Sequence, residues 1–273
     1  MPTEDVWSNP SFAGPIEAAR MAAFLEERAC CPDQLQAQAA LRREVAAVSG
    51  EHILEVGSGS GVLARLVAED VVPTGHVTGL DISPDMTEAA RTYAASAGLA
   101  AVITFETGEA ESLPYDAGSF DVAFAARLLL HAGDPRLVMR ELRRVVRRGG
   151  RVVLMDWDFG TVAVDHTDRA LTRRILEWRC DHHGGDNWSG RTLRSHLIEA
   201  GFRDVRVTAI VCLALDDASS LTASLWRAAD VALAGGAISQ AEHTAWRGDL
   251  DARLASSRFC ASVVHFIAKG GDR

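Results

Sequence analysis

The chain has 273 residues, of which 48% are hydrophobic and 24% are charged, and its formal net charge is −9. This composition excludes a disordered or fibrous chain and favours one large globular domain, while the acidic balance argues against nucleic acid as a partner. The five cysteines form no C-x-x-C pair and predict neither a disulfide framework nor a zinc site. No stretch is long and apolar enough to span a membrane, and the N-terminus lacks the apolar segment of a signal peptide, so a cytoplasmic location is expected.

Two helices are predicted before the first strand. Residues 1–15 contain three prolines and a glycine and are expected to be irregular. Helices are expected over Ile16–Arg28 and from Pro32 to about Val48. We therefore expect an N-terminal helical cap at 1–48 and a larger α/β domain at 49–273.

The stretch HILEVGSGSG, residues 52–61, has the pattern of a strand followed by a glycine turn. Residues 53–56 favour a buried strand, and residues 62–68 carry the apolar face of a following helix. Glycines permit positive φ, and a turn at the carboxyl end of a strand in an open α/β sheet is a ligand site. The dinucleotide fingerprint G-x-G-x-x-G is not matched, because Val62 stands where its third glycine would be.

Glu55 precedes the first glycine of the turn by two positions. A carboxylate there would repel a pyrophosphate but suits a ligand with a cationic group. With Gly57, Gly59 and Gly61 it resembles motif I, E/D-x-G-x-G-x-G, of the class I S-adenosylmethionine (SAM) methyltransferases. The resemblance implies that SAM is the cofactor, that these residues and Ser58 hold it, and that the N-terminal helices help to cover the cofactor or the substrate.

The second strand is predicted over residues 75–81 and ends at Asp81. A carboxylate at this place accepts hydrogen bonds from a ribose diol in NAD and SAM sites alike. The alternative role, capping the next helix, is better filled by Ser83, which precedes a proline at the first helical position. Asp81 is therefore the expected ribose ligand, and the resemblance implies that Ile82 and Met86 flank the adenine.

A third strand is expected over residues 101–107. The following segment, 108–121, resembles the D-A-x-x-L-P-F…F-D stretch of ubiquinone/menaquinone-type methyltransferases (methyltransferase type 11). The resemblance implies that Glu109, where aspartate is commoner, accepts a hydrogen bond from the exocyclic amine of adenine, and that the backbone N–H of Ala110 bonds a ring nitrogen. Glu111 is interpreted as a solvated helix residue.

The fourth strand, residues 120–126, is followed by Arg127 and His131. The resemblance implies that this segment lies along the methionine part of SAM. Arg127 then either reaches the methionine carboxylate or pairs with an acid of the protein. His131 is either a residue of the substrate pocket or an ordinary packing histidine. A helix over 137–146 and a fifth strand over 151–156 follow.

The loop 180–188, between helices predicted over 165–179 and 190–200, is rich in ionisable residues and glycine. His182 or His183 is a candidate general base toward a substrate in this loop. A metal site is disfavoured, because adjacent histidines seldom point the same way and no third ligand is suitably spaced. The remaining interpretation is a polar loop anchored by a tryptophan, and no metal is expected.

The C-terminal part predicts a sixth strand at 205–215 and a seventh at 259–268, separated by a helical insertion at about 216–256. The resemblance implies that the seventh strand lies antiparallel between strands five and six. The predicted fold is α/β: a Rossmann-like seven-stranded mixed sheet with its last strand antiparallel, helices on both faces, N-terminal helices and the insertion. We expect the insertion to act as a lid or as the contact of a homodimer.

These features predict a SAM-dependent methyltransferase acting on oxygen or carbon of a small organic acceptor, such as a secondary metabolite or a quinone-like molecule. The methyl group of SAM is already activated, which explains why no catalytic motif is compelling. The alternatives are a SAM-binding protein that promotes cyclisation or lacks methyl transfer, an NAD-dependent oxidoreductase, and an RNA or protein methyltransferase. The G-x-G-x-G spacing argues against the oxidoreductase, and the acidic charge and lack of an added binding domain argue against a macromolecular substrate.

Overall fold

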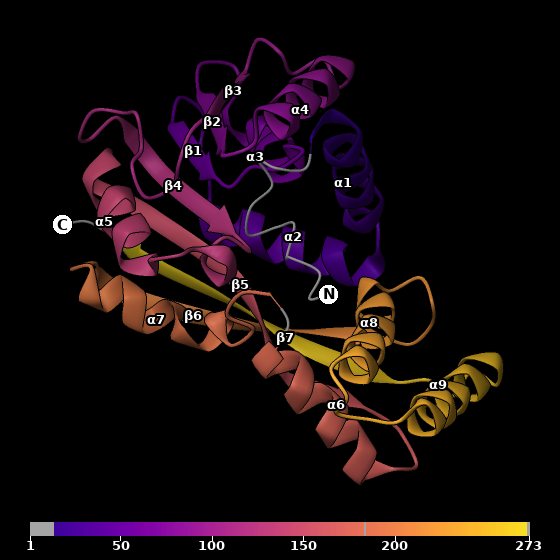
Figure 1. The fold of residues 1–273 in the computed structure, drawn as a ribbon. Helices are drawn as coiled ribbons and strands as arrows, with labels where there is room; N and C mark the ends of the chain where they lie inside the picture. The colour runs from indigo at the N-terminus through magenta and orange to yellow at the C-terminus, as the bar shows by residue number, and fades with distance from the viewer. Residues whose placement is uncertain (1–13, 183, 272–273) are drawn as a thin grey trace.

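The computed structural model describes residues 14–182 and 184–271, and its centre is a seven-stranded sheet (Figure 1). The strands are β1 (His52–Val56), β2 (His76–Asp81), β3 (Ile103–Thr107), β4 (Phe120–Ala126), β5 (Val146–Val164), β6 (Arg203–Ala214) and β7 (Ala261–Gly271). Their order across the sheet is β3-β2-β1-β4-β5-β7-β6. Neighbours from β3 to β5 run parallel, whereas β7 is antiparallel to both β5 and β6. The predicted mixed sheet and the antiparallel position of its last strand are confirmed.

Helices cover both faces of the sheet. They are α1 (Gly14–Ala29), α2 (Pro32–Val45), α3 (Val62–Val71), α4 (Pro84–Ser96), the 3-10 helix η2 (Leu129–His131), α5 (Pro135–Val145), α6 (Arg169–His182), α7 (Ser189–Glu199), α8 (Ser220–Ala234) and α9 (Gln240–Ala255). One face is buried under α2, α3 and α4 and the other under α5 and α7. Within the described ranges, no helix is both long enough and apolar enough to cross a membrane.

The glycine turn lets α3 start close to the sheet. This helix buries Leu63, Val67 and Val71 at intervals of four residues, the spacing of one helical face. Gly61 stands directly before it with a φ of 77°, and a Cβ there would lie 2.5 Å from the ring of Phe105 on β3. A side chain at this position would meet both backbone strain and a clash, so the sequence needs glycine.

The second helix ends at Val45, before the expected end near Val48. Ala46 takes a left-handed conformation with a φ of 49°. The guanidinium group of Arg151 donates to the carbonyl oxygens of Val45 (2.7 Å) and Ala46 (2.8 Å). Arg151 thus supplies the partners that the last carbonyl groups of a helix lack.

The fifth strand is much longer than the sequence predicts. The expected strand covers 151–156, whereas β5 runs from Val146 to Val164. Its second half stays in the sheet because β7 pairs with it, as in the pair Trp157 and His265, with a change of register between Asp158 and Ala163. This antiparallel extension carries the sheet beyond the carboxyl ends of β1, β2 and β4.

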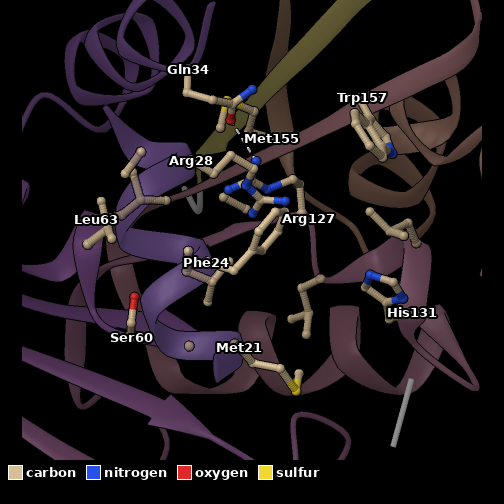
Figure 2. Close-up of a pocket in the computed structure, with 18 of the residues that line it drawn as sticks. Met21, Phe24, Arg28, Gln34, Ser60, Leu63, Arg127, His131, Met155 and Trp157 are labelled. Atoms are coloured by element: carbon tan, nitrogen blue, oxygen red, sulfur yellow. Dashed lines mark hydrogen bonds between the residues drawn. The ribbon is translucent and has the colours of Figure 1, made fainter. Parts of the chain in front are cut away.

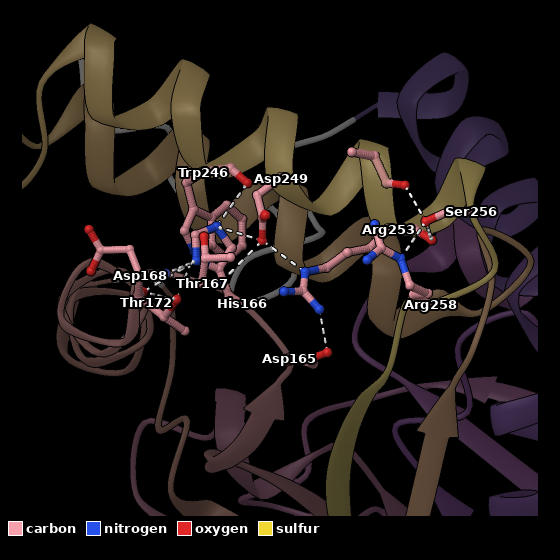
Figure 3. A network of polar contacts seen from close by, with 11 residues as sticks. Asp165, His166, Thr167, Asp168, Thr172, Trp246, Asp249, Arg253, Ser256 and Arg258 are labelled. Atoms are coloured by element: carbon pink, nitrogen blue, oxygen red, sulfur yellow. Dashed lines mark hydrogen bonds and ion pairs between the residues drawn. The ribbon is translucent and has the colours of Figure 1, made fainter.

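The extension supports a group of three helices. Figure 1 shows α6, α8 and α9 gathered at the end of the molecule away from α3 and α4, and α8 and α9 make up the predicted insertion. The side chain of Trp246 on α9 is fully buried, and its Nε1 donates to the hydroxyl of Thr172 on α6 (3.0 Å). Figure 3 shows the polar network that joins α9 to the segment before α6: His166 Nε2 lies 3.2 Å from the Trp246 carbonyl oxygen, and Arg253 pairs with both Asp249 and Asp165.

Candidate functional site

A cavity of about 590 Å³ lies at the carboxyl ends of β1, β2, β4 and β5 (Figure 2). Ligands of open α/β sheets bind at this edge, and small-molecule sites have volumes of roughly 300–1,000 Å³. Residues of the glycine turn, of α1 and α2, and of α8 all line the cavity. The N-terminal helices, the sheet and the insertion therefore build one site together.

The glycine turn forms part of the cavity wall. The backbone N–H groups of Gly57 and Ser58 donate to the carbonyl oxygen of Leu80 (2.8 and 3.0 Å), which holds the turn against β2. Gly57 has a φ of 76°, and a Cβ on it would lie 2.9 Å from a methyl carbon of Leu128. Gly57, Ser58 and Gly59 line the cavity, whereas Gly61 packs under the Phe105 ring. A ligand can therefore lie directly against the backbone at residues 57–59.

Three side chains in this wall have buried oxygen atoms without a partner in the described part of the chain. Glu55 is 2% exposed, and its Oε2 makes no hydrogen bond within the described residues. The hydroxyl groups of Ser58 and Ser60 are also buried without a hydrogen-bond partner there. Burial and, to a smaller extent, the charge of Asp81 raise the pKa of Glu55 well above its usual range. Unpartnered buried polar atoms are costly, so these oxygens fit a ligand that brings hydrogen-bond donors and positive charge, as SAM does.

Asp81 lies at the end of β2 and also lines the cavity. Its Oδ2 accepts from the N–H of Gly59 (2.8 Å) and its Oδ1 from the N–H of Ser83 (3.0 Å), so it fixes the turn. Burial raises its pKa. Each carboxylate oxygen can accept a further hydrogen bond, which leaves room for a ribose diol. Ser83 caps α4 by accepting from the N–H of Met86 (3.3 Å), as predicted.

Two neighbouring glutamates exchange their expected places. Glu109, expected at the adenine, is exposed and is not among the residues that line the cavity. Glu111, expected in solvent, is half-buried and does line it, together with Ala110. Ile82 and Met86, which the resemblance puts beside the adenine, are cavity residues as well. Of these two glutamates, Glu111 is therefore the one that lines the cavity.

The helix α1 is tied directly to the glycine turn. Arg65 donates to the carbonyl oxygen of Ser60 (2.8 Å) and pairs with Glu26 of α1 (2.6 Å). Leu25 approaches so closely that a Cβ on Gly59 would lie 2.9 Å from it. These contacts hold α1 against the turn, at the wall of the cavity.

Arg127 connects three parts of the chain above the cavity. Its Nη1 donates to Oε1 of Gln34 on α2 (2.7 Å), and Gln34 Nε2 donates to Asp33 (2.9 Å) and to the hydroxyl of Ser220 on α8 (3.0 Å). Asp33 accepts from the N–H and the hydroxyl of Ser220 (3.0 and 2.6 Å). The hydrogen-bond partner of Arg127 is thus an amide, and an ion pair with an acid is not observed in the described chain. This network holds α8 against α2 and the end of β4.

The three candidate bases have different positions. His131, on η2, lines the cavity. His182 is exposed at the end of α6 and stacks on Trp178 with 3.7 Å between ring centroids, and it is not a cavity residue. His183 lies outside the described residues. Among residues 14–182 and 184–271, no three His, Cys, Asp or Glu side chains gather in a way that could hold a metal.

Sequence analysis did not single out several cavity residues on α1, α6 and α8 and one in the middle of β5. These are Arg28, Met155, Arg179, Ser220, Ala223, Ser224 and Arg227. The four on α8 have the spacing 0, 3, 4, 7 of one helical face, which carries three small side chains and one arginine. That spacing was the signal in the sequence that could have grouped them on one face of the insertion.

Comparison with known proteins gives a consistent assignment. A model of the methyltransferase domain family matches residues 47–190, more than half of the chain. An uncharacterized 37.1 kDa protein of transposon TN4556 from Streptomyces fradiae is 32% identical over 219 residues, 80% of this chain and 61% of that protein. Methyltransferase GfsG from Streptomyces halstedii is 33% identical over 180 residues, 63% of this chain and 58% of that protein. The chain spans about three fifths of the length of these two relatives.

Two further likenesses concern a shorter region and the fold. The 27-O-demethylrifamycin SV methyltransferase from Amycolatopsis mediterranei is 37% identical over 111 residues, 40% of this chain and 39% of that enzyme. The solved structure of the YcgJ protein from Bacillus subtilis shares the fold with a TM-score of 0.57 and 17% identity, over 86% of this chain and 98% of that one. The family match, the sheet order and the glycine turn show that this chain belongs to the methyltransferase domain family, within the class I proteins that use SAM as methyl donor.

Proposed function

We propose that this protein transfers the methyl group of SAM to an oxygen or carbon atom of a small organic acceptor. The observation that carries the proposal is the buried Glu55 carboxylate, with no partner on Oε2 in the described chain, in the same cavity as Asp81. The relative named as a methyltransferase of 27-O-demethylrifamycin SV is a precedent for a small organic acceptor. The acidic net charge of −9 supports such an acceptor over a nucleic acid.

Toward the cofactor, we assign each part of the wall a binding role. Glu55 compensates its positive charge, Asp81 accepts from its ribose hydroxyl groups, and Glu111 takes the adenine amine in place of Glu109. The other assigned residues are Gly57, Ser58 and Gly59 as backbone contacts, Ile82, Met86 and Ala110 around the adenine, and Arg127 at the methionine carboxylate. SAM supplies a methyl group that its sulfonium already activates.

The protein's own contribution is then to hold the acceptor in line and to exclude water. The proposed cover consists of the N-terminal helices α1 and α2 and the insertion at 216–256, and the support for it is that α1, α2 and α8 all contribute to the cavity. Trp157 also lines it, and its Nε1 is buried without a partner in the described chain, so it is available to orient an acceptor oxygen. His131 is the candidate base that lines the cavity, and we propose it for removing a proton from a hydroxyl acceptor.

The cofactor part of the proposal is tested by calorimetry with S-adenosylhomocysteine (SAH), the product of methyl transfer. The matched pair is Glu111→Gln and Glu109→Gln, which remove the same charge two positions apart. We expect weaker binding in the first variant by about tenfold or more and unchanged binding in the second. Equal effects in both variants would refute the assignment at the adenine, and no binding to the unaltered protein would refute the proposed function.

The transfer part is tested by incubating the protein with SAM and a panel of phenols, enols and activated methylene compounds. We expect SAH to form in proportion to a methylated product, as detected by mass spectrometry. Conversion of an acceptor while SAM stays intact would instead support the alternative of a SAM-binding protein that promotes cyclisation.

A further inference from the structure

Two helix faces line the cavity outside the glycine turn, and each carries an arginine. The α8 face consists of small side chains and one cation: Ser220, Ala223, Ser224 and Arg227. The α1 face includes Phe24 and Arg28. The small side chains leave space, and the aromatic ring gives an apolar surface. The charged residues of these faces are Arg28, Arg227 and the exposed Glu27 of α1, and the two arginines are the groups that can attract an anion.

Arg28 has no hydrogen-bond acceptor among the described residues. The contact observed for its guanidinium is with the Phe24 ring, 5.4 Å from the centroid. Figure 2 shows Arg28 close to Arg127, with the Phe24 ring beside them. Burial, followed by the charge of Arg127 and to a smaller extent that of Arg227, lowers the pKa of Arg28. Like charges gathered in a partly dry site repel each other, and a bound anion relieves that repulsion.

Among residues 14–182 and 184–271, no carboxylate forms an ion pair with Arg28. The charge of Asp33 acts to raise the pKa of Arg28, but the carboxylate oxygens of Asp33 already accept hydrogen bonds from Ser220 and Gln34. Arg227 is exposed on α8 and makes no hydrogen bond or ion pair with the described chain. Arg28 and Arg227 therefore both keep donors open toward the cavity.

We propose that Arg28 and Arg227 bind a carboxylate of the methyl acceptor between α1 and α8, so that the acceptor is an organic acid. This inference rests on the proposed function. It adds a substrate class: an acid whose apolar body lies against Phe24 and whose nucleophilic atom points toward the glycine turn. An arginine pair suits a carboxylate because the planar guanidinium matches its two oxygens.

SAM carries a carboxylate too and is a second source of the same chemistry. It also carries an ammonium and a sulfonium group, so it brings net positive charge into a cavity that already holds three arginines at this end. Arg127, which follows β4 next to the glycine turn, is the one we assign to the methionine carboxylate. Arg28 and Arg227 come from the covering helices and remain for the acceptor.

The test begins with the SAH-saturated protein and pairs of ligands that differ at the carboxyl group, which is charged in the acid and neutral in the ester. Aromatic and aliphatic hydroxy acids, such as 4-hydroxycinnamate, and their methyl esters are compared by thermal shift. The acid that binds best is titrated by calorimetry into the unaltered protein, Arg28→Gln, Arg227→Gln and the control Arg173→Gln. Arg173 is exposed on α6 and does not line the cavity, so its variant removes the same charge away from the subsite.

We expect acids to bind more tightly than their esters, and each cavity variant to weaken the acid by about tenfold or more, with the control unchanged and SAH affinity retained in all variants. Esters that match the acids throughout the panel, including no binding by either, would overturn the inference. The inference would also be overturned if Arg28→Gln and Arg227→Gln weakened the binding of SAH and not that of the acid. The two arginines would then bind the carboxylate of the cofactor. If the unaltered protein did not bind SAH, the proposed function would be overturned and this inference with it.

Discussion

Replacing Asp156 by asparagine isolates one buried carboxyl group at the N-terminus of α7. Asp156 is 1% exposed, and its Oδ2 accepts from the hydroxyl of Ser189 (2.8 Å), whereas its Oδ1 has no partner in the described chain. Burial raises its pKa from an ordinary value of 3.8 to about 7. The folded protein therefore binds a proton at this site more tightly than the unfolded chain does.

The expected magnitude follows from this difference. About 3 pK units at about 1.36 kcal/mol each give up to about 4 kcal/mol in the free energy of unfolding. Because the folded pKa is raised, this contribution is fully present below about pH 4 and is lost as the pH rises through about 7. The asparagine variant stays neutral and lacks this loss. Ser189→Ala removes a hydrogen bond that favours the charged form, so it raises the pKa of Asp156 further and delays ionisation to higher pH.

The assay is urea unfolding of the unaltered protein and both variants between about pH 5 and pH 9. The informative quantity is the difference in unfolding free energy between Asp156→Asn and the unaltered protein, because constant packing effects of the substitution cancel along the pH axis. We expect this difference to move in favour of the variant as the pH rises. A difference that stays constant with pH would refute the reasoning about the buried carboxyl group.

Gly61→Ala should lower the free energy of unfolding by about 2–4 kcal/mol, because it adds left-handed strain and a clash with Phe105. The control Gly118→Ala, at a φ of 73° with no atom within 3.6 Å, should show the strain alone. Chemical denaturation compares the two variants. SAM binding should release a proton from Glu55, so the affinity for SAM should rise with pH up to the raised pKa of Glu55 in the free protein. Calorimetry in buffers of different ionisation enthalpy measures the proton release. No proton release, or a pH dependence of affinity that persists in Glu55→Gln, would contradict the prediction. Burial acts to raise the pKa of Asp33, but hydrogen bonds from Ser220 and Gln34 outweigh it and lower that pKa below its usual range. Asp33 should therefore stabilise the fold above about pH 4, and this stabilisation should be lost on acidification. The melting temperature of Asp33→Asn should lack this loss at low pH.

The sequence predicted the parts of the site that local patterns determine. The glycine turn requires a strand before it and a helix after it, and the apolar spacing of residues 53–71 predicts both. Asp81 ends a predicted strand next to that turn, so its position follows from the strand order. Ser83 with Pro84 is a local capping signal, and it gives the start of α4 correctly.

The choice between Glu109 and Glu111 depends on contacts that are distant in the sequence. The segment after β3 has no regular structure, so no periodicity indicates which side chains face inward. Its path is held by α5, where Arg144 donates to the carbonyl oxygens of Leu113 (2.9 Å) and Tyr115 (2.6 Å). An anchor from another element decides which glutamate reaches the cavity, and a local pattern cannot encode it.

The predictions of the length of β5 and of the position of His182 were wrong for the same reason. Residues beyond Asp156 join the sheet because β7 offers them a partner, and that partner comes from the far end of the chain. His182 stays helical and stacks on Trp178, one turn earlier on α6, instead of turning toward the cavity. The insertion itself was predicted, but the contact of α8 with the cavity depends on its hydrogen bonds to Gln34 and Asp33 on α2, which are far away in the sequence.

The most direct measurement is a crystal structure of the protein with SAH. The account predicts that the nucleoside lies against residues 57–59, that its ribose hydroxyl groups are within hydrogen-bond distance of Asp81, and that its ammonium group faces Glu55. An SAH molecule bound elsewhere, with this wall of the cavity unoccupied, would contradict it.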